Sequence, residues 1–251
     1  MKYKIYFLVS FSLIIHHLSA QQFINKGTIE FEVTTNVKKT MGNNSFDEQL
    51  KELMPTFKTA YYNYTFADNK SIFKFDRYDE KKGKIPEFLK RDEDINEWYS
   101  DFNTGQTYMQ KNIWGSPINF KDSIAHIQWK LSNESRMIAG FNCRKATGKI
   151  MDSVYVFAFY TDEITISGGP CSINGLPGMV MGVTIPRLYM SMLATKLTVA
   201  DVKENIIKPI AVKKYYTNKE IKTMLDKRIE SYTVSDEDKK YIEQMYWNTL
   251  L

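Results

Sequence analysis

The residues best suited to chemistry in this chain are sulfur-bearing. It has two cysteines, Cys143 and Cys171, and four methionines follow the second within about one strand and a turn: Met179, Met181, Met190 and Met192. Residues two apart on a strand share a face, so each methionine pair could present two thioethers together. Thioethers with a thiolate suit Cu(I). Methionine also fills irregular gaps in a core, and that explanation accounts for the same residues.

Acid–base and nucleophilic chemistry has little to draw on. His126 is the one histidine outside the first twenty residues, and no Gly-x-Ser-x-Gly segment is present. A thiol-dependent enzyme would need His126 beside one of the cysteines. Asp162 and Glu163 are adjacent and would point to opposite faces of a strand, so they cannot face each other across a cleft as glycoside hydrolysis requires. The sequence therefore identifies no catalytic residue and no cofactor.

The N-terminus indicates export. Two lysines precede an apolar run over residues 5–15, and Ala20 fits a signal peptidase site. We expect residues 1–20 to be a cleaved signal peptide and residues 21–251 to form a single domain that is periplasmic or secreted. No cysteine follows the apolar run to carry a lipid, and no later segment is long and apolar enough to span a bilayer, so no transmembrane anchor is expected after cleavage. The net charge of +5 gives no reason to expect a nucleic-acid partner.

Export also bears on the two cysteines. Two cysteines in an oxidising compartment most often pair, so a Cys143–Cys171 disulfide is the expectation. Two free thiols and a thiolate metal site are the alternatives.

Most of the chain has the pattern of strands joined by short turns. Period-two alternation or apolar runs predict strands over residues 27–37, 62–66, 73–75, 98–102, 107–110, 127–131, 141–146, 154–160, 179–185 and 196–202. The charged residues 76–97 predict a solvated loop. A capping box at Ser45 predicts a helix ending near Met54, and two more such boxes, at Thr217 and Ser235, predict C-terminal helices.

Together these patterns predict an α+β, β-dominated fold. Short turns favour antiparallel pairing, giving a single curved antiparallel sheet, a possible half-barrel, with one N-terminal and one or two C-terminal helices. A concave aromatic face of that kind could shelter an apolar ligand.

One short motif carries a resemblance. In Gly175-Leu176-Pro177-Gly178, the proline presets φ and Gly178 supplies a positive φ, which indicates a tight turn leading into a buried strand. The segment resembles the signature of the GLPGLI family of exported Bacteroidetes proteins, present here as GLPGMV at residues 175–180. The similarity covers roughly residues 27–202 and includes the segment from Ile138 to Ala146 around Cys143.

The resemblance implies an exported protein whose motif is not an established active site. Some members similar to this chain carry a histidine after the signature strand, and residues 187–192 here contain none. We therefore expect an envelope protein of the GLPGLI type with no identifiable catalytic site, acting as a binding or accessory protein for an envelope protein or an apolar ligand. Copper binding through Cys171 and nearby methionines is one alternative, and a thiol-dependent enzyme is another.

Overall fold

The structure is a computed structural model that describes residues 23–90, 93–113, 115–151, 153–199, 202, 204–230 and 236–251. The predicted signal peptide, residues 1–20, lies outside the described residues.

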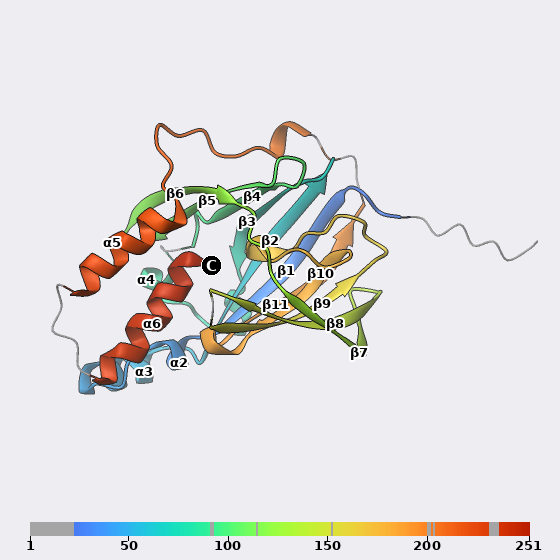
Figure 1. The fold of residues 1–251 in the computed structure, drawn as a ribbon. Coiled ribbons are helices and arrows are strands. Elements are labelled where there is room, and N and C mark those ends of the chain that lie inside the picture. The colour runs from blue at the N-terminus through green and yellow to red at the C-terminus, as the bar shows by residue number, and fades with distance from the viewer. Residues whose placement is uncertain are drawn as a thin grey trace, which may run out of the picture.

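The fold is built on one open antiparallel sheet of eleven strands, in the order β6-β5-β4-β3-β2-β1-β11-β10-β9-β8-β7. Figure 1 shows that the sheet is curved, with the C-terminal end of the chain lying in its hollow. The prediction of a β-dominated fold with a single curved antiparallel sheet is confirmed. The strands are β1 (Gly27–Asn36), β2 (Phe57–Ala67), β3 (Lys70–Tyr78), β4 (Glu97–Asp101), β5 (Gln106–Ile113), β6 (Ser116–Ser123), β7 (Trp129–Ile138), β8 (Phe141–Ile150), β9 (Val154–Thr161), β10 (Met179–Ile185) and β11 (Met190–Thr198).

Two strand meanders make up this sheet. The N-terminal meander is β1 to β6 and the C-terminal meander is β7 to β11, and within each of them neighbouring strands are consecutive in the chain. The sheet joins the two meanders where β1 pairs with β11, in a register that places Val33 opposite Met192 and Thr35 opposite Met190. This β1–β11 pairing is called the seam below.

The helices lie mainly at the start and the end of the chain. They are α2 (Val37–Thr40), α3 (Ser45–Leu53), α4 (Glu87–Lys90), α5 (Asn218–Glu230) and α6 (Asp236–Leu250), with short 3-10 turns η1 (Glu80–Lys82), η2 (Pro170–Ser172), η3 (Pro186–Leu188) and η4 (Glu204–Ile206). The Thr217 cap of α5 is confirmed, because the Thr217 hydroxyl accepts from the Glu220 amide at 3.2 Å. The Ser45 cap of α3 is wrong by one residue, since the Asn44 side chain accepts from the Asp47 amide at 2.8 Å.

The core lies on the concave face of the sheet. Ile29 and Phe31, alternate residues of β1, are completely buried, and Phe31 stands opposite Tyr62 of β2. The Tyr62 ring stacks on Phe73 with centroids 4.9 Å apart. Offset aromatic pairs of this kind add about 0.5–1.5 kcal/mol beyond their buried area. The alternation that predicted these strands is therefore the alternation between core and outer face.

Helix α6 covers part of the concave face with its last two turns (Figure 1). The indole Nε1 of Trp98 on β4 donates to the Leu251 carbonyl at 2.9 Å, and the Gln244 amide donates to the Arg187 carbonyl at 3.0 Å. Trp247 is buried with them. The end of α6 is thus tied to both meanders and covers the space beneath it.

The main differences from expectation are strand β6, Ser116–Ser123, which was not predicted, and the boundaries of two other segments. Strand β11 begins at Met190 rather than Lys196, because the seam pairs its first half with β1. The predicted loop over residues 76–97 contains the end of β3 together with η1 and α4.

Candidate functional site

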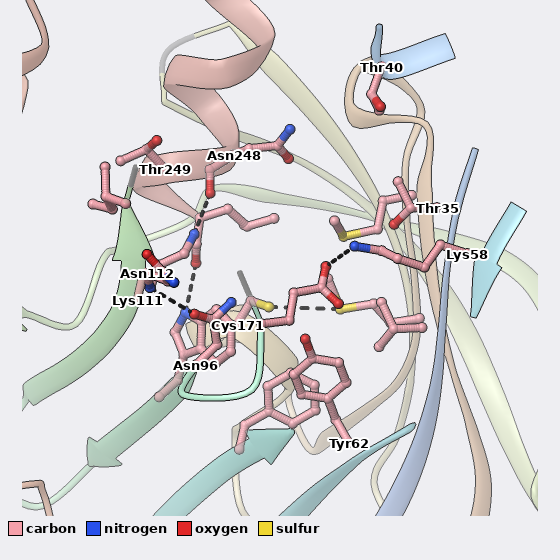
Figure 2. A pocket seen from close by; sticks show the side chains of 18 of the residues that line it. Thr35, Thr40, Lys58, Tyr62, Asn96, Lys111, Asn112, Cys171, Asn248 and Thr249 are labelled. Atoms are coloured by element: carbon pink, nitrogen blue, oxygen red, sulfur yellow. Dashed lines mark hydrogen bonds and ion pairs between the residues drawn. The ribbon is translucent and has the colours of Figure 1, made fainter. Parts of the chain in front are cut away.

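A cavity of about 430 Å³ lies between the concave face and helix α6. Its walls come from β1, β2, β3, β4, β5 and β11, from turn η2, and from the last turns of α6 (Figure 2). Both meanders therefore contribute side chains to one space, which straddles the seam.

One wall of the cavity is aromatic. Tyr62, Phe73 and Trp98 line it from three adjacent strands. The Phe73 and Trp98 ring centroids are 5.6 Å apart, and those of Tyr62 and Trp98 are 6.3 Å apart. Flat rings held in this way offer a rigid apolar surface to a ligand at little conformational cost.

An ion pair lies at another wall. The Lys58 amine of β2 is 2.6 Å from the Glu93 carboxylate, and the two side chains are 13% and 23% exposed. Figure 2 shows this contact as a dashed line reaching Lys58. Each charge is neutralised by the other, so this pair adds polarity to the cavity without adding net charge.

Lys111 of β5 is the second lysine of the cavity, and it is 7% exposed. Its amine donates to the carbonyl of Asn248 in the last turn of α6 and lies 5.7 Å from the Trp98 ring centroid. Burial lowers the pKa of Lys111 to about 8, against a partial opposing effect of Cys171 and Glu93. The last-turn carbonyls of a helix favour a cation, so Lys111 also anchors α6 over the cavity.

Cys171 enters the cavity from turn η2, which packs against β4. Its thiol faces the sulfur of Met192 at 4.0 Å. Burial raises the thiol pKa to about 12, with Lys111 acting in the opposite direction. The cavity thiol is therefore protonated at neutral pH and is a poor nucleophile.

The segment from Gly175 to Gly178 supports the loop that carries Cys171. Gly178 has φ +131°, and a Cβ at this position would come within 2.0 Å of the Thr161 carbonyl oxygen. The predicted positive φ at Gly178 and the turn into β10 are confirmed. The Trp129 indole donates to the Asn174 carbonyl at 2.8 Å, and Ser167 donates to the Leu176 carbonyl at 2.6 Å. Gly175, Leu176, Pro177 and Gly178 thus have a structural role, since they hold the loop and do not line the cavity.

The expected Cys143–Cys171 disulfide is not supported, because both thiols are free. Cys143 lies on β8, near one end of the sheet, where its thiol faces the Phe141 carbonyl at 3.6 Å. Cys171 lies against β4, in the other meander. Burial raises the pKa of Cys143 to about 11. The two residues are close in sequence, but the topology sends them to opposite halves of the fold.

Of the other candidate residues from the sequence, some line the cavity and some do not. Met190 and Met192 line the cavity, whereas Met179 and Met181 are fully buried and do not. His126 is exposed and is not a cavity residue, so a Cys–His dyad does not form there. Among the described residues, no group of three or more His, Cys, Asp or Glu side chains is placed to hold a metal ion.

Sequence reasoning missed Lys111, Trp98 and the Lys58–Glu93 pair. The alternation around Trp98 predicts its strand, but nothing local marks it as a binding residue. Lys111 follows a polar residue in a strand, a position at which a lysine is ordinarily solvated. It alternates with Met109 and Ile113 on the buried face of β5, and this period-two pattern is the local signal that could have shown its burial.

No protein-family model matches the chain, and no curated protein matches it either. Among solved structures, PNGF-II in space group C2 is similar with a TM-score of 0.51 at 12% identity, over 79% of this chain and 32% of that one. PNGF-II in space group P21 has a TM-score of 0.48 at 14% identity, over 79% and 33%. An uncharacterized conserved protein from Thermus thermophilus has a TM-score of 0.38 at 5% identity, over 76% and 91%.

These likenesses concern the fold alone. The chain spans about a third of the length of PNGF-II. In the part of the chain that the structure describes, no helix combines the length and apolar character needed to cross a bilayer.

Proposed function

We propose that this chain is an exported, non-enzymatic binding protein of the GLPGLI type that takes a small, partly apolar ligand into the cavity beneath α6. The observation that carries the proposal is the cavity itself, since its volume of about 430 Å³ lies within the range of small-molecule sites. Such sites combine an apolar lining with a few placed polar groups. Here the aromatic wall is the apolar part, and Lys111 with the end of α6 is the polar part.

The chemistry of the cavity favours binding over turnover. Its thiol has a raised pKa, and its carboxylate, Glu93, is held by Lys58. General acid–base catalysis needs a group that titrates near the working pH within reach of the substrate. Lys111 has such a pKa, but its amine is engaged with the Asn248 carbonyl.

Binding can be tested with Nile red, a neutral apolar dye whose fluorescence rises when it leaves water. Thr35 lines the cavity, whereas Thr34 points to the other face of β1 and its hydroxyl lies 3.5 Å from that of Thr59. Thr35→Trp should fill the cavity and weaken dye binding by about tenfold or more, while Thr34→Trp should leave it unchanged. Unfolding curves for both variants check that the fold is kept.

Two outcomes would remove the proposal. One is equal dye binding by the two tryptophan variants. The other is turnover in a broad hydrolase screen by protein that carries no ligand in native mass spectrometry.

Export is a separate part of the proposal and rests on residues 1–20. N-terminal sequencing of protein purified from its native source should begin at Gln21. A mature chain that begins at Met1 would contradict it.

A further inference from the structure

Sulfur atoms from three separate elements line the same cavity. Cys171 comes from η2, Met190 and Met192 from β11, and Met245 from α6. Among them, the Cys171 thiol and the Met192 thioether lie 4.0 Å apart. Figure 2 shows this contact as a dashed line from Cys171 across the cavity.

The two methionines of β11 are held on the cavity side by the seam. Met192 stands opposite Val33 and Met190 opposite Thr35, and both partners also line the cavity. Residues two apart on a strand share a face. The thioethers of Met190 and Met192 are therefore presented to the same space as the thiol.

Cys171 is placed by an uncommon backbone conformation. Its φ of 50° and ψ of 40° lie in the left-handed region, which residues other than glycine adopt rarely and at some cost. The next residue, Ser172, has φ 57°, and its hydroxyl contacts that of Thr107 at 3.1 Å. The fold thus holds the thiol at this point of the cavity at the expense of backbone strain.

The separation of the two sulfurs matches what a soft metal ion requires. With metal–sulfur bonds of about 2.3 Å, two ligands at about 120° have sulfurs about 4 Å apart. Thiolate and thioether ligands select Cu(I) over harder cations. We propose that Cys171, Met192 and Met190 form a binding site for a soft monovalent metal ion, Cu(I), with Met245 of α6 closing the site.

The charges balance in such a site. The thiol loses its proton on binding, so that Cys–SH and Cu(I) give Cys–S–Cu(I) and one proton released to solvent. The thiolate and the ion together carry no net charge, so binding places no uncompensated cation beside Lys111. The inference goes beyond the proposed function, because the metal would occupy one wall of a cavity that retains room for an organic ligand.

This assignment corrects the ligand set expected from sequence. Met179 and Met181 were the candidates nearest to Cys171, but both are fully buried outside the cavity. Met190 and Met192, which the sequence also indicated, remain candidates, and Met245 of α6 is added.

The test is an anaerobic Cu(I) titration of the full chain against the chromophoric chelator bicinchoninate. One Cu(I) should bind per chain, and the apparent affinity should rise about tenfold per pH unit between about pH 6 and 8, because one thiol proton is displaced. Cys171→Ser should abolish this pH dependence and weaken binding by about a hundredfold. Met192→Leu, which conserves volume and should keep the fold, should weaken binding by about tenfold.

Two variants serve as controls. Cys143→Ser removes the other buried thiol, and Met137→Leu alters an exposed methionine on β7. Neither should change Cu(I) affinity. The inference is overturned if Cu(I) does not bind, if Met192→Leu binds as the wild type does, or if Cys143→Ser is the variant that loses the pH dependence. Nile red binding that persists in these cases would leave the proposed function standing and remove only the metal site.

Discussion

Replacing Lys111 with methionine should change how the stability of the protein depends on pH. Methionine keeps most of the apolar stem of lysine and removes the amine, which is buried beneath α6 and contacts the Asn248 carbonyl. The ammonium has lost its hydration, and the described cavity residues supply no carboxylate in direct contact with it. A buried charge in that situation is destabilising.

The magnitude follows from the pKa, which burial lowers from 10.5 to about 8. At about 1.4 kcal/mol per pKa unit, keeping Lys111 protonated in the folded protein costs about 3 kcal/mol below pH 8. Between pH 8 and 10.5 the unfolded chain binds more protons at this residue than the folded chain does, so stability rises with pH there. The wild type should therefore gain about 2 kcal/mol relative to Lys111→Met between about pH 7 and 9.5.

Urea unfolding of both proteins at several pH values measures this difference directly. The comparison cancels the titration of the buried tyrosines and thiols, which both proteins share. Lys130→Met, at an exposed position of β7, is the control and should show a constant difference from the wild type. A constant difference for Lys111→Met as well would refute the reasoning, because it would mean that the Lys111 amine titrates as it does in water.

Three further predictions concern the backbone, the thiols and a helix cap. Gly178→Ala should destabilise the fold by about 2–4 kcal/mol in urea unfolding, because its methyl group would meet the Thr161 carbonyl oxygen at 2.0 Å. Cys143 and Cys171 should both resist a thiol reagent in the native protein, and both should react after denaturation without reductant. Thr217→Ala should lower stability by about 1 kcal/mol in thermal unfolding, because the N-cap of α5 is lost.

The glycine prediction has a matched comparison, and the other two have outcomes that would contradict them. Gly140 also has a positive φ, of 88°, but a Cβ at this position would meet no atom within 4 Å. Gly140→Ala should therefore lower the free energy of unfolding by less, about 1 kcal/mol. Equal costs for the two glycines would contradict the steric argument. If the thiols of the denatured protein reacted only after reduction, the protein would contain the Cys143–Cys171 disulfide. An unchanged melting temperature for Thr217→Ala would show that tertiary packing, rather than the cap, sets where α5 begins.

Local patterns were sufficient to predict most of the sheet. Alternation in β1 and in the hairpin of β2 and β3 reflects a core on one face, which is a property of a few neighbouring residues. The first half of β11 was missed, because Ala194 and Thr195 interrupt the apolar run in the sequence. Its strand conformation is fixed by pairing with β1, which lies far away in sequence.

The candidate site was less predictable for the same physical reason. The disulfide expectation used compartment and cysteine number, whereas thiol pairing depends on where strands β4 and β8 lie in the sheet. Lys111 looked solvated because lysine usually is, although it shares the buried face of β5 with Met109 and Ile113 and lies beneath the end of α6. Copper binding by the methionines near Cys171 stays a prediction, and which of them share a cavity with Cys171 needed the tertiary structure.

The β1–β11 seam divides the sheet into two halves. Residues 27–123 and 129–198 each form a meander whose strand pairs are internal, and eight β1–β11 residue pairs join them along the sheet. If the β1–β11 pairing opened in two copies at once, β1 of each copy could pair with β11 of the other, because the pairing edges are identical. The product would be a domain-swapped dimer with two complete cavities. Tyr62 and Lys111 come from one half, and Cys171 and Met192 come from the other. Ligand capture by two separately expressed pieces, the second continued to residue 251 so that it includes α6, would therefore show that the two halves had assembled.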